Sequence, residues 1–242
     1  MRKYIMLFFI VSVLVWTEGS SQAKTIINLV DVSGSLSKCD TAFRKNLLII
    51  NNLVDTLGKK DRFIIYSYRS HGKPFKVVDF IFPSRRGGKN RNIVAARQEL
   101  RIKIKKGMGK ALAKDRLKMG GGGTDCRGAL NYTLMIISDM KNITPPVQIN
   151  HFSDGIQTTS IGSFKPKFYA GYLKLLIQKL NESFLGKPNR VNEIVWYGGI
   201  CYGPLELNLS QSARLQAQLR QTWCNFLKRE LPSTRISYLL NY

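Results

Sequence analysis

The chain has 242 residues, of which 44% are hydrophobic and 22% are charged, and its formal net charge is +23. This length suits one sizeable domain with a buried core, and the composition is that of an ordinary soluble globular protein rather than a disordered or fibrous one. The large excess of positive charge favours acidic partners.

The N-terminus has the pattern of a signal peptide. Arg2 and Lys3 precede an apolar run from Tyr4 to Trp16, and a small-x-small cleavage signal ends at Ala23. This order predicts a cleaved signal peptide over residues 1–23 and a soluble, exported protein, either periplasmic or secreted. An uncleaved N-terminal anchor is the alternative, although the apolar run is short for a membrane-spanning helix.

Strand and helix patterns alternate along the rest of the chain. Strands are predicted over residues 24–31, 62–68, 75–82, 146–155, 192–200 and 235–242. Apolar residues at steps of three and four predict a helix over 41–57, and apolar positions predict two more around 169–180 and 215–226. Helix-forming residues predict a helix over 92–118, and the stretch 127–140 is also predicted to be helical. This alternation predicts a single α/β domain over residues 24–242, with a doubly wound, mainly parallel sheet and helices on both faces.

A strongly basic segment covers residues 84–119. Thirteen Lys or Arg residues lie between Ser84 and Lys118, against two acidic residues. One interpretation is a solvated helical face. The other is attachment to a polyanion such as nucleic acid, envelope glycan or an anionic membrane surface. For that second interpretation the candidate residues are Arg85, Arg86, Lys103, Lys105, Lys106 and Lys110.

The four cysteines are Cys39, Cys126, Cys201 and Cys224. An even number in an exported chain predicts two disulfides, whose connectivity the spacing leaves open. Four buried thiols are the alternative. No C-x-x-C pair is present, so the spacing does not indicate a zinc site.

Three polar fragments lie where a predicted strand or a run of glycines ends. Asp31, Ser33 and Ser35 come after the first strand, Thr124 follows a run of four glycines, and Asp154 ends the strand that contains "HFSD". In an open α/β sheet, ligands bind at the carboxyl ends of the strands. These side chains offer only oxygen donors, which suit a hard cation such as Mg²⁺, with Mn²⁺ or Ca²⁺ as alternatives.

The fragments D-V-S-G-S, G-G-T-D and F-S-D-G, in this order, resemble the metal-ion-dependent adhesion site of the von Willebrand factor A (VWA) domain family. The resemblance covers nearly all of residues 24–242. It implies that Ser33, Ser35 and Thr124 ligate a metal through their hydroxyl groups, and that Asp31 and Asp154 ligate it directly or through water. The remaining coordination position would take a carboxylate from a partner protein. The basic segment is longer than the family pattern needs.

Two further expectations depend on this resemblance. Asp125, next to Thr124, is not a metal ligand in the family. If the loops converge on one metal, Cys39 and Cys126 would be close enough for a disulfide that braces the site, which leaves Cys201 to pair with Cys224; other pairings stay open.

The expected function is therefore that of an exported protein-binding module, in which a bound divalent cation captures an acidic group of a partner protein. The alternative is an electrostatic polyanion-binding protein that uses segment 84–119. Catalysis is not expected, because G-x-S-x-G and P-loop patterns are absent. The chain has two histidines, and His151 is expected to be a strand residue whose ring is satisfied locally.

Overall fold

The computed structural model describes residues 22–32, 40–69, 73–84, 93–117, 124–143, 145–158, 169–182, 185, 190–198 and 209–240. The strands are β1 (Thr25–Asp31), β2 (Arg62–Tyr68), β3 (Phe75–Ile81), β4 (Val147–Phe152), β5 (Val191–Gly198) and β6 (Arg235–Leu240). The helices are α3 (Asp40–Asp55), α4 (Ile93–Leu117), α5 (Cys126–Asp139), α6 (Tyr169–Asn181) and α8 (Leu209–Glu230). The predicted elements are confirmed, and their ends move by a few residues. The predicted signal peptide up to residue 21 lies outside the described residues.

The six strands form one sheet in the order β3-β2-β1-β4-β5-β6. All neighbours are parallel except β2 and β3, which pair antiparallel. The strand β1 occupies the centre, and all seven of its residues are buried. Burial on both faces explains why its sequence is an almost continuous apolar run instead of an alternating one.

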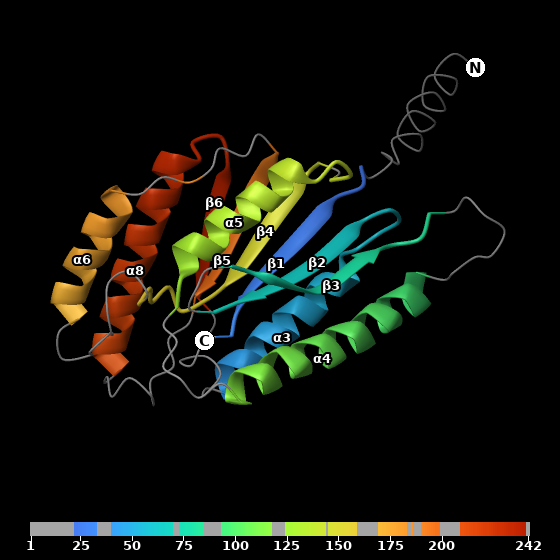
Figure 1. Ribbon diagram of the computed structural model, residues 1–242, viewed down its shortest axis with the longest axis horizontal. Helices are drawn as coiled ribbons and strands as arrows, with labels where there is room; N and C mark the ends of the chain where they lie inside the picture. The colour runs from blue at the N-terminus through green and yellow to red at the C-terminus, as the bar shows by residue number, and fades with distance from the viewer. Residues whose placement is uncertain are drawn as a thin grey trace, which may run out of the picture.

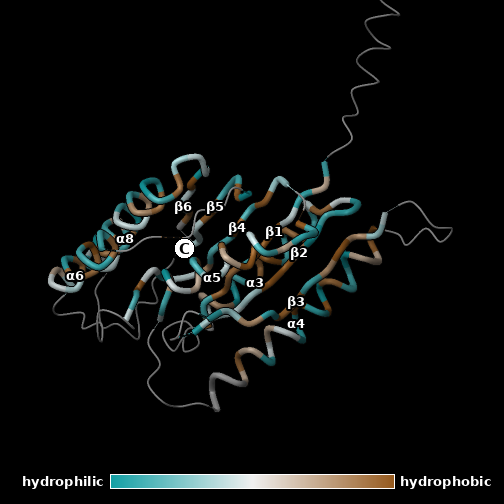
Figure 2. The backbone as a smooth tube through the Cα atoms, turned by 45° about the horizontal axis from the view of Figure 1, so that its top comes forward, coloured by the Kyte–Doolittle hydropathy of each residue, from teal (hydrophilic) through white to brown (hydrophobic). Residues whose placement is uncertain are grey.

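Helices cover both faces of the sheet (Figure 1). On β1, Ile26 and Val30 face a core shared with α3 and α4. Ile27 and Leu29 point to the opposite face and join the core formed with α5, α6 and α8. Figure 2 shows polar and apolar segments alternating along α6 and α8, as expected for helices with one buried face. The predicted single α/β domain is therefore confirmed.

The helix α4 contains most of the basic segment and packs against the edge strand β3 and against α3. Residues four apart on α4 face the core that this helix shares with α3. The C-terminal half of α4 reaches the carboxyl end of β2. There the Arg69 Nη2 donates to the Ala111 carbonyl at 3.1 Å, and the Ser67 hydroxyl lies 3.8 Å from the Met108 sulfur. None of the described helices is long and apolar enough to cross a membrane.

Two glycines of α4 give a matched test of this packing. A Cβ on Gly107 would lie 2.7 Å from Val77 Cγ1 and 3.3 Å from the Val77 carbonyl oxygen, whereas a Cβ on Gly109 has nothing within 4 Å. Both Gly→Ala changes gain about 1 kcal/mol of helix propensity. In Gly107→Ala, overpacking against β3 opposes this gain with a cost of about 1–3 kcal/mol.

We expect Gly109→Ala to raise the free energy of unfolding and Gly107→Ala to lower it, as measured by urea denaturation. Equal effects of the two substitutions would contradict the close approach of α4 to β3.

Candidate metal centre

Two of the predicted metal ligands lie at the carboxyl ends of adjacent central strands. Asp31 is the last residue of β1, and Asp154 follows the end of β4 at Phe152 by two residues. Both carboxylates are buried, with 0% and 2% of their surface exposed. Because β1 and β4 pair in parallel, their carboxyl ends meet at the same edge of the sheet, as the sequence predicted.

A third predicted ligand, Thr124, lies on a loop that is joined to the Asp154 loop. The Thr124 amide donates to the Thr158 hydroxyl at 2.6 Å, and the Thr158 amide donates to the Thr124 carbonyl at 2.9 Å. Ser33 and Ser35 lie outside the described residues. Strand pairing therefore places Asp31 and Asp154 at one edge of the sheet, and the contact with Thr158 joins the Thr124 loop to the loop after β4.

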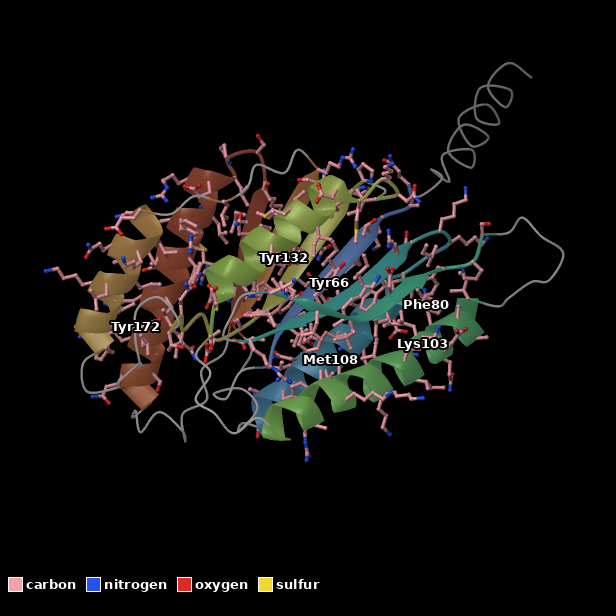
Figure 3. All side chains as sticks on the ribbon, viewed as in Figure 1. Tyr66, Phe80, Lys103, Met108, Tyr132 and Tyr172 are labelled. Atoms are coloured by element: carbon pink, nitrogen blue, oxygen red, sulfur yellow. The ribbon has the colours of Figure 1, made fainter. Side chains whose placement is uncertain are left out.

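The loop after β4 is held by the two helices that cover it. Gly155 has a φ of 77°, which favours glycine, and its carbonyl accepts a hydrogen bond from the Trp223 indole of α8 at 2.9 Å. The Tyr172 hydroxyl of α6 accepts from the Gln157 amide at 2.7 Å and lies 3.0 Å from the Gln157 carbonyl; the tyrosine is labelled in Figure 3. The Asp154 carboxylate also accepts from the Ile156 amide at 2.9 Å. These bonds fix the backbone around Asp154.

A cluster of buried polar side chains lies beneath Asp31. The Ser153 hydroxyl donates to Asp31 Oδ2 at 3.0 Å and lies 3.2 Å from the Cys126 sulfur. The Tyr68 hydroxyl lies 3.5 Å from that sulfur and 2.7 Å from His151 Nε2. Sequence reasoning missed this cluster, although Tyr68 pairs with Asp31 in the register of β1 and β2 and Ser153 lies within the F-S-D-G fragment.

The electrostatics of this cluster place both carboxylates near one thiol. Burial raises the pKa of Cys126 well above its usual value, and the negative charges of Asp31 and Asp154 raise it further. Burial and the charge of Asp31 likewise raise the pKa of Tyr68. The thiol and the phenol therefore stay protonated at neutral pH, and each brings one hydrogen-bond donor to the site.

Neither predicted disulfide is seen in the structure. Cys126 and Cys224 are free thiols, while Cys39 and Cys201 lie outside the described residues. The Cys126 side chain is fully buried and contacts Ser153 and Tyr68.

Asp125 has a structural role that agrees with its exclusion from the ligand set. It is the N-cap of α5, and its carboxylate accepts from the Gly128 amide at 2.9 Å. Within the described ranges, no group of three or more His, Cys, Asp or Glu side chains could hold a metal. The predicted set differs from such groups because it combines two carboxylates with hydroxyl oxygens, a donor chemistry that fits Mg²⁺.

The basic residues of α4 fall into two kinds. The Lys103 ammonium pairs with Glu99 at 2.9 Å and lies 4.9 Å from the centre of the Phe80 ring, and Figure 3 labels both Lys103 and Phe80. By contrast, three exposed lysines form no ion pair with any residue that the structure describes: Lys105, Lys106 and Lys110. Arg85 and Arg86 lie outside the described residues.

The ring of His151 is satisfied at only one nitrogen. Its Nε2 bonds to Tyr68, whereas its Nδ1 is buried and has no hydrogen-bond partner among the described residues. The expectation of a locally satisfied ring is therefore only half correct. The ring also lies against Trp196, at 4.0 Å between ring centres. Burial lowers the pKa of His151 from 6.5 to about 3.

This depressed pKa predicts a loss of stability in acid. Between pH 6.5 and about 3 the unfolded chain binds a proton at His151 that the folded chain does not, so the free energy of unfolding falls as the pH falls through this window. We expect His151→Gln to flatten the dependence in urea denaturation at pH 4 to 7. Equal slopes for the unmodified protein and His151→Gln would contradict the assignment.

No protein-family model and no curated protein matches the sequence. Among solved structures, the chain is similar to the ArnB paralog VWA2 from Sulfolobus acidocaldarius (15% identity, 75% of this chain and 36% of that chain, TM-score 0.42). It is also similar to BatB from Bacteroides thetaiotaomicron (11% identity, 91% of this chain and 92% of that chain, TM-score 0.40). A third similar structure is the von Willebrand factor type A protein from Catenulispora acidiphila (12% identity, 88% of this chain and 43% of that chain, TM-score 0.39). The chain thus spans less than half of the first and third of these proteins. Likenesses at these identities and TM-scores assign neither family nor function.

Proposed function

We propose that the chain is a VWA-like protein-binding domain that uses a divalent cation to capture an acidic group of a partner protein. The ion would be held by five residues: Asp31, Ser33, Ser35, Thr124 and Asp154. The observation that carries the proposal is the position of two buried carboxylates at the carboxyl ends of neighbouring central strands, with the Thr124 loop joined to the second of them. We further propose that the domain is exported and acts by binding instead of catalysis.

The donor chemistry indicates what such an ion would do. A magnesium ion bound by two carboxylates and neutral hydroxyl oxygens keeps an affinity for another anionic oxygen. A carboxylate of a partner protein can supply that oxygen. The protein's own part is to hold Asp31 and Asp154 in fixed positions, which the strand pairing and the bonds from Ser153 and Ile156 support.

Magnesium binding tests the proposal directly. A ligand that binds only the folded state raises the melting temperature, so we expect Mg²⁺ to raise the Tm of the protein and EDTA to reverse the rise. Asp31→Asn keeps an oxygen that accepts from Ser153 but removes the charge, and it should abolish the rise. Mn²⁺ and Ca²⁺ in the same assay would establish which ion is preferred.

The matched control is Asp55→Asn. Asp55 is exposed and pairs with Arg101 at 2.6 Å on the surface of α3 and α4, so this substitution should leave the Mg²⁺ effect intact. A Tm that does not respond to Mg²⁺ in the unmodified protein, or an equal response in Asp31→Asn, would contradict the proposal.

A second candidate function is electrostatic binding of a polyanion by α4. It is favoured by Lys105, Lys106 and Lys110, which are exposed and form no ion pair within the described part of the chain. Such binding weakens steeply as the salt concentration rises and would not respond to chelation.

Retention on immobilised heparin separates this function from metal-dependent capture. We expect Lys106→Glu/Lys110→Glu to elute at lower salt than Lys59→Glu/Lys174→Glu, which makes the same change in net charge at other exposed positions. EDTA should have no effect on either. If the two double variants elute together, retention reflects net charge alone and α4 is not a binding surface.

A further inference from the structure

Five buried side chains form one continuous line of contacts that ends on Asp31. The Tyr68 hydroxyl lies 2.7 Å from His151 Nε2 and 3.5 Å from the Cys126 sulfur. The Ser153 hydroxyl lies 3.2 Å from that sulfur and 3.0 Å from Asp31 Oδ2. All five residues are at most 2% exposed. Because these side chains are buried, their donors and acceptors need partners within the protein.

The number of protons fixes the direction of the line. The Ser153 hydroxyl donates to Asp31, so its single proton is committed to that bond. With the Cys126 thiol as the donor to Ser153, its sulfur accepts from the Tyr68 hydroxyl, which also interacts with the Ser153 side chain. Because Tyr68 donates its only hydroxyl proton to Cys126, its oxygen accepts a hydrogen bond from His151 Nε2.

This direction requires that the proton of the neutral His151 ring be on Nε2. The other nitrogen, Nδ1, is then a bare lone pair, which agrees with its having no hydrogen-bond partner among the described residues. The opposite tautomer would bury an N–H group without an acceptor, a costly arrangement in a dry interior. The unsatisfied nitrogen thus supports the direction derived from Asp31.

The backbone of Ser153 is also fixed. Its amide donates to the Tyr197 carbonyl at 3.2 Å, and its carbonyl accepts from the Trp196 indole at 3.1 Å, both on β5. The Gly155 amide donates to the Ser153 hydroxyl at 3.1 Å, which occupies a further lone pair. The hydroxyl is therefore presented to Asp31 from a rigid frame.

We infer that Ser153, Cys126, Tyr68 and His151 form a one-way hydrogen-bond chain that positions the Asp31 carboxylate for the cation. In such a chain each bond polarises the next, so that the bond to Asp31 is strengthened by groups that do not touch it. The inference rests on the proposed function, in which Asp31 is a metal ligand. Cys126 acts in it as a thiol that relays a hydrogen bond, not as half of a disulfide.

The tautomer of His151 tests the direction without any metal. The chain has two histidines, so ¹⁵N-histidine labelling in a His71→Gln background leaves one imidazole in the spectrum. Long-range ¹H–¹⁵N correlations on the metal-free protein should show the proton on Nε2. A proton on Nδ1 would overturn the inferred direction.

The positioning role is tested with two substitutions at Cys126. Cys126→Ser keeps one donor and one acceptor and should bind Mg²⁺ as the unmodified protein does, whereas Cys126→Ala interrupts the chain and should bind it about tenfold or more weakly, as is typical of groups that orient metal ligands. The dissociation constants come from isothermal titration calorimetry. A purely structural role predicts the opposite order of Mg²⁺ affinities for the two variants. In that case alanine would disturb the buried site less than serine, because burying a hydroxyl group without a hydrogen-bond partner is costly.

The outcomes separate the two proposals. Equal Mg²⁺ affinity of Cys126→Ala and the unmodified protein would overturn the positioning role and leave the metal site standing. Absence of Mg²⁺ binding by the unmodified protein would overturn the proposed function together with the positioning role, while the tautomer still decides the direction. If Cys126→Ala does not fold, Tyr68→Phe, which removes one hydroxyl from the middle of the chain, replaces it and should weaken Mg²⁺ binding.

Discussion

The burial of β1 on both faces is the constraint on which the rest of the structure depends. All seven of its residues are inaccessible to solvent, and the strand pairs with β2 on one side and β4 on the other. Its last residue is nevertheless a carboxylate. A buried charge is tolerated only with partners that offset the loss of hydration, so Asp31 demands donors from the neighbouring elements. The Ser153 hydroxyl supplies one of them.

The two layers of helices differ in what each contributes near the end of β1. The layer of α5, α6 and α8 supplies contacts to the site: Cys126 lies beneath Asp31, and Tyr172 and Trp223 hold the loop after β4. The layer of α3 and α4 supplies the other core and the exposed lysines. The proposed metal site and the proposed polyanion surface therefore depend on separate layers, and a substitution in one can leave the other intact.

Much of the fold was predictable from the sequence because each element has a strong local pattern. The apolar run that ends at Asp31 and the apolar steps over residues 41–57 can be recognised from the sequence alone, and so can the position of Asp154 at a strand end. The line from His151 through Tyr68 to Ser153 was not predictable, because it joins β2, β4 and α5 by side-chain contacts that depend on strand register. The pairing of the cysteines was not predictable for a related reason: spacing gives loop proximity but not the direction in which a cysteine side chain points.

The two indole bonds described above have an optical consequence. The chain has three tryptophans, and one of them, Trp16, belongs to the predicted signal peptide. The other two donate to the carbonyl groups on either side of Asp154: Trp196 to Ser153 and Trp223 to Gly155. The tryptophan fluorescence of the mature chain would then arise from two indoles that both bond to one loop. A rearrangement of that loop would change the emission of both, so the protein carries its own reporter of the state of the site.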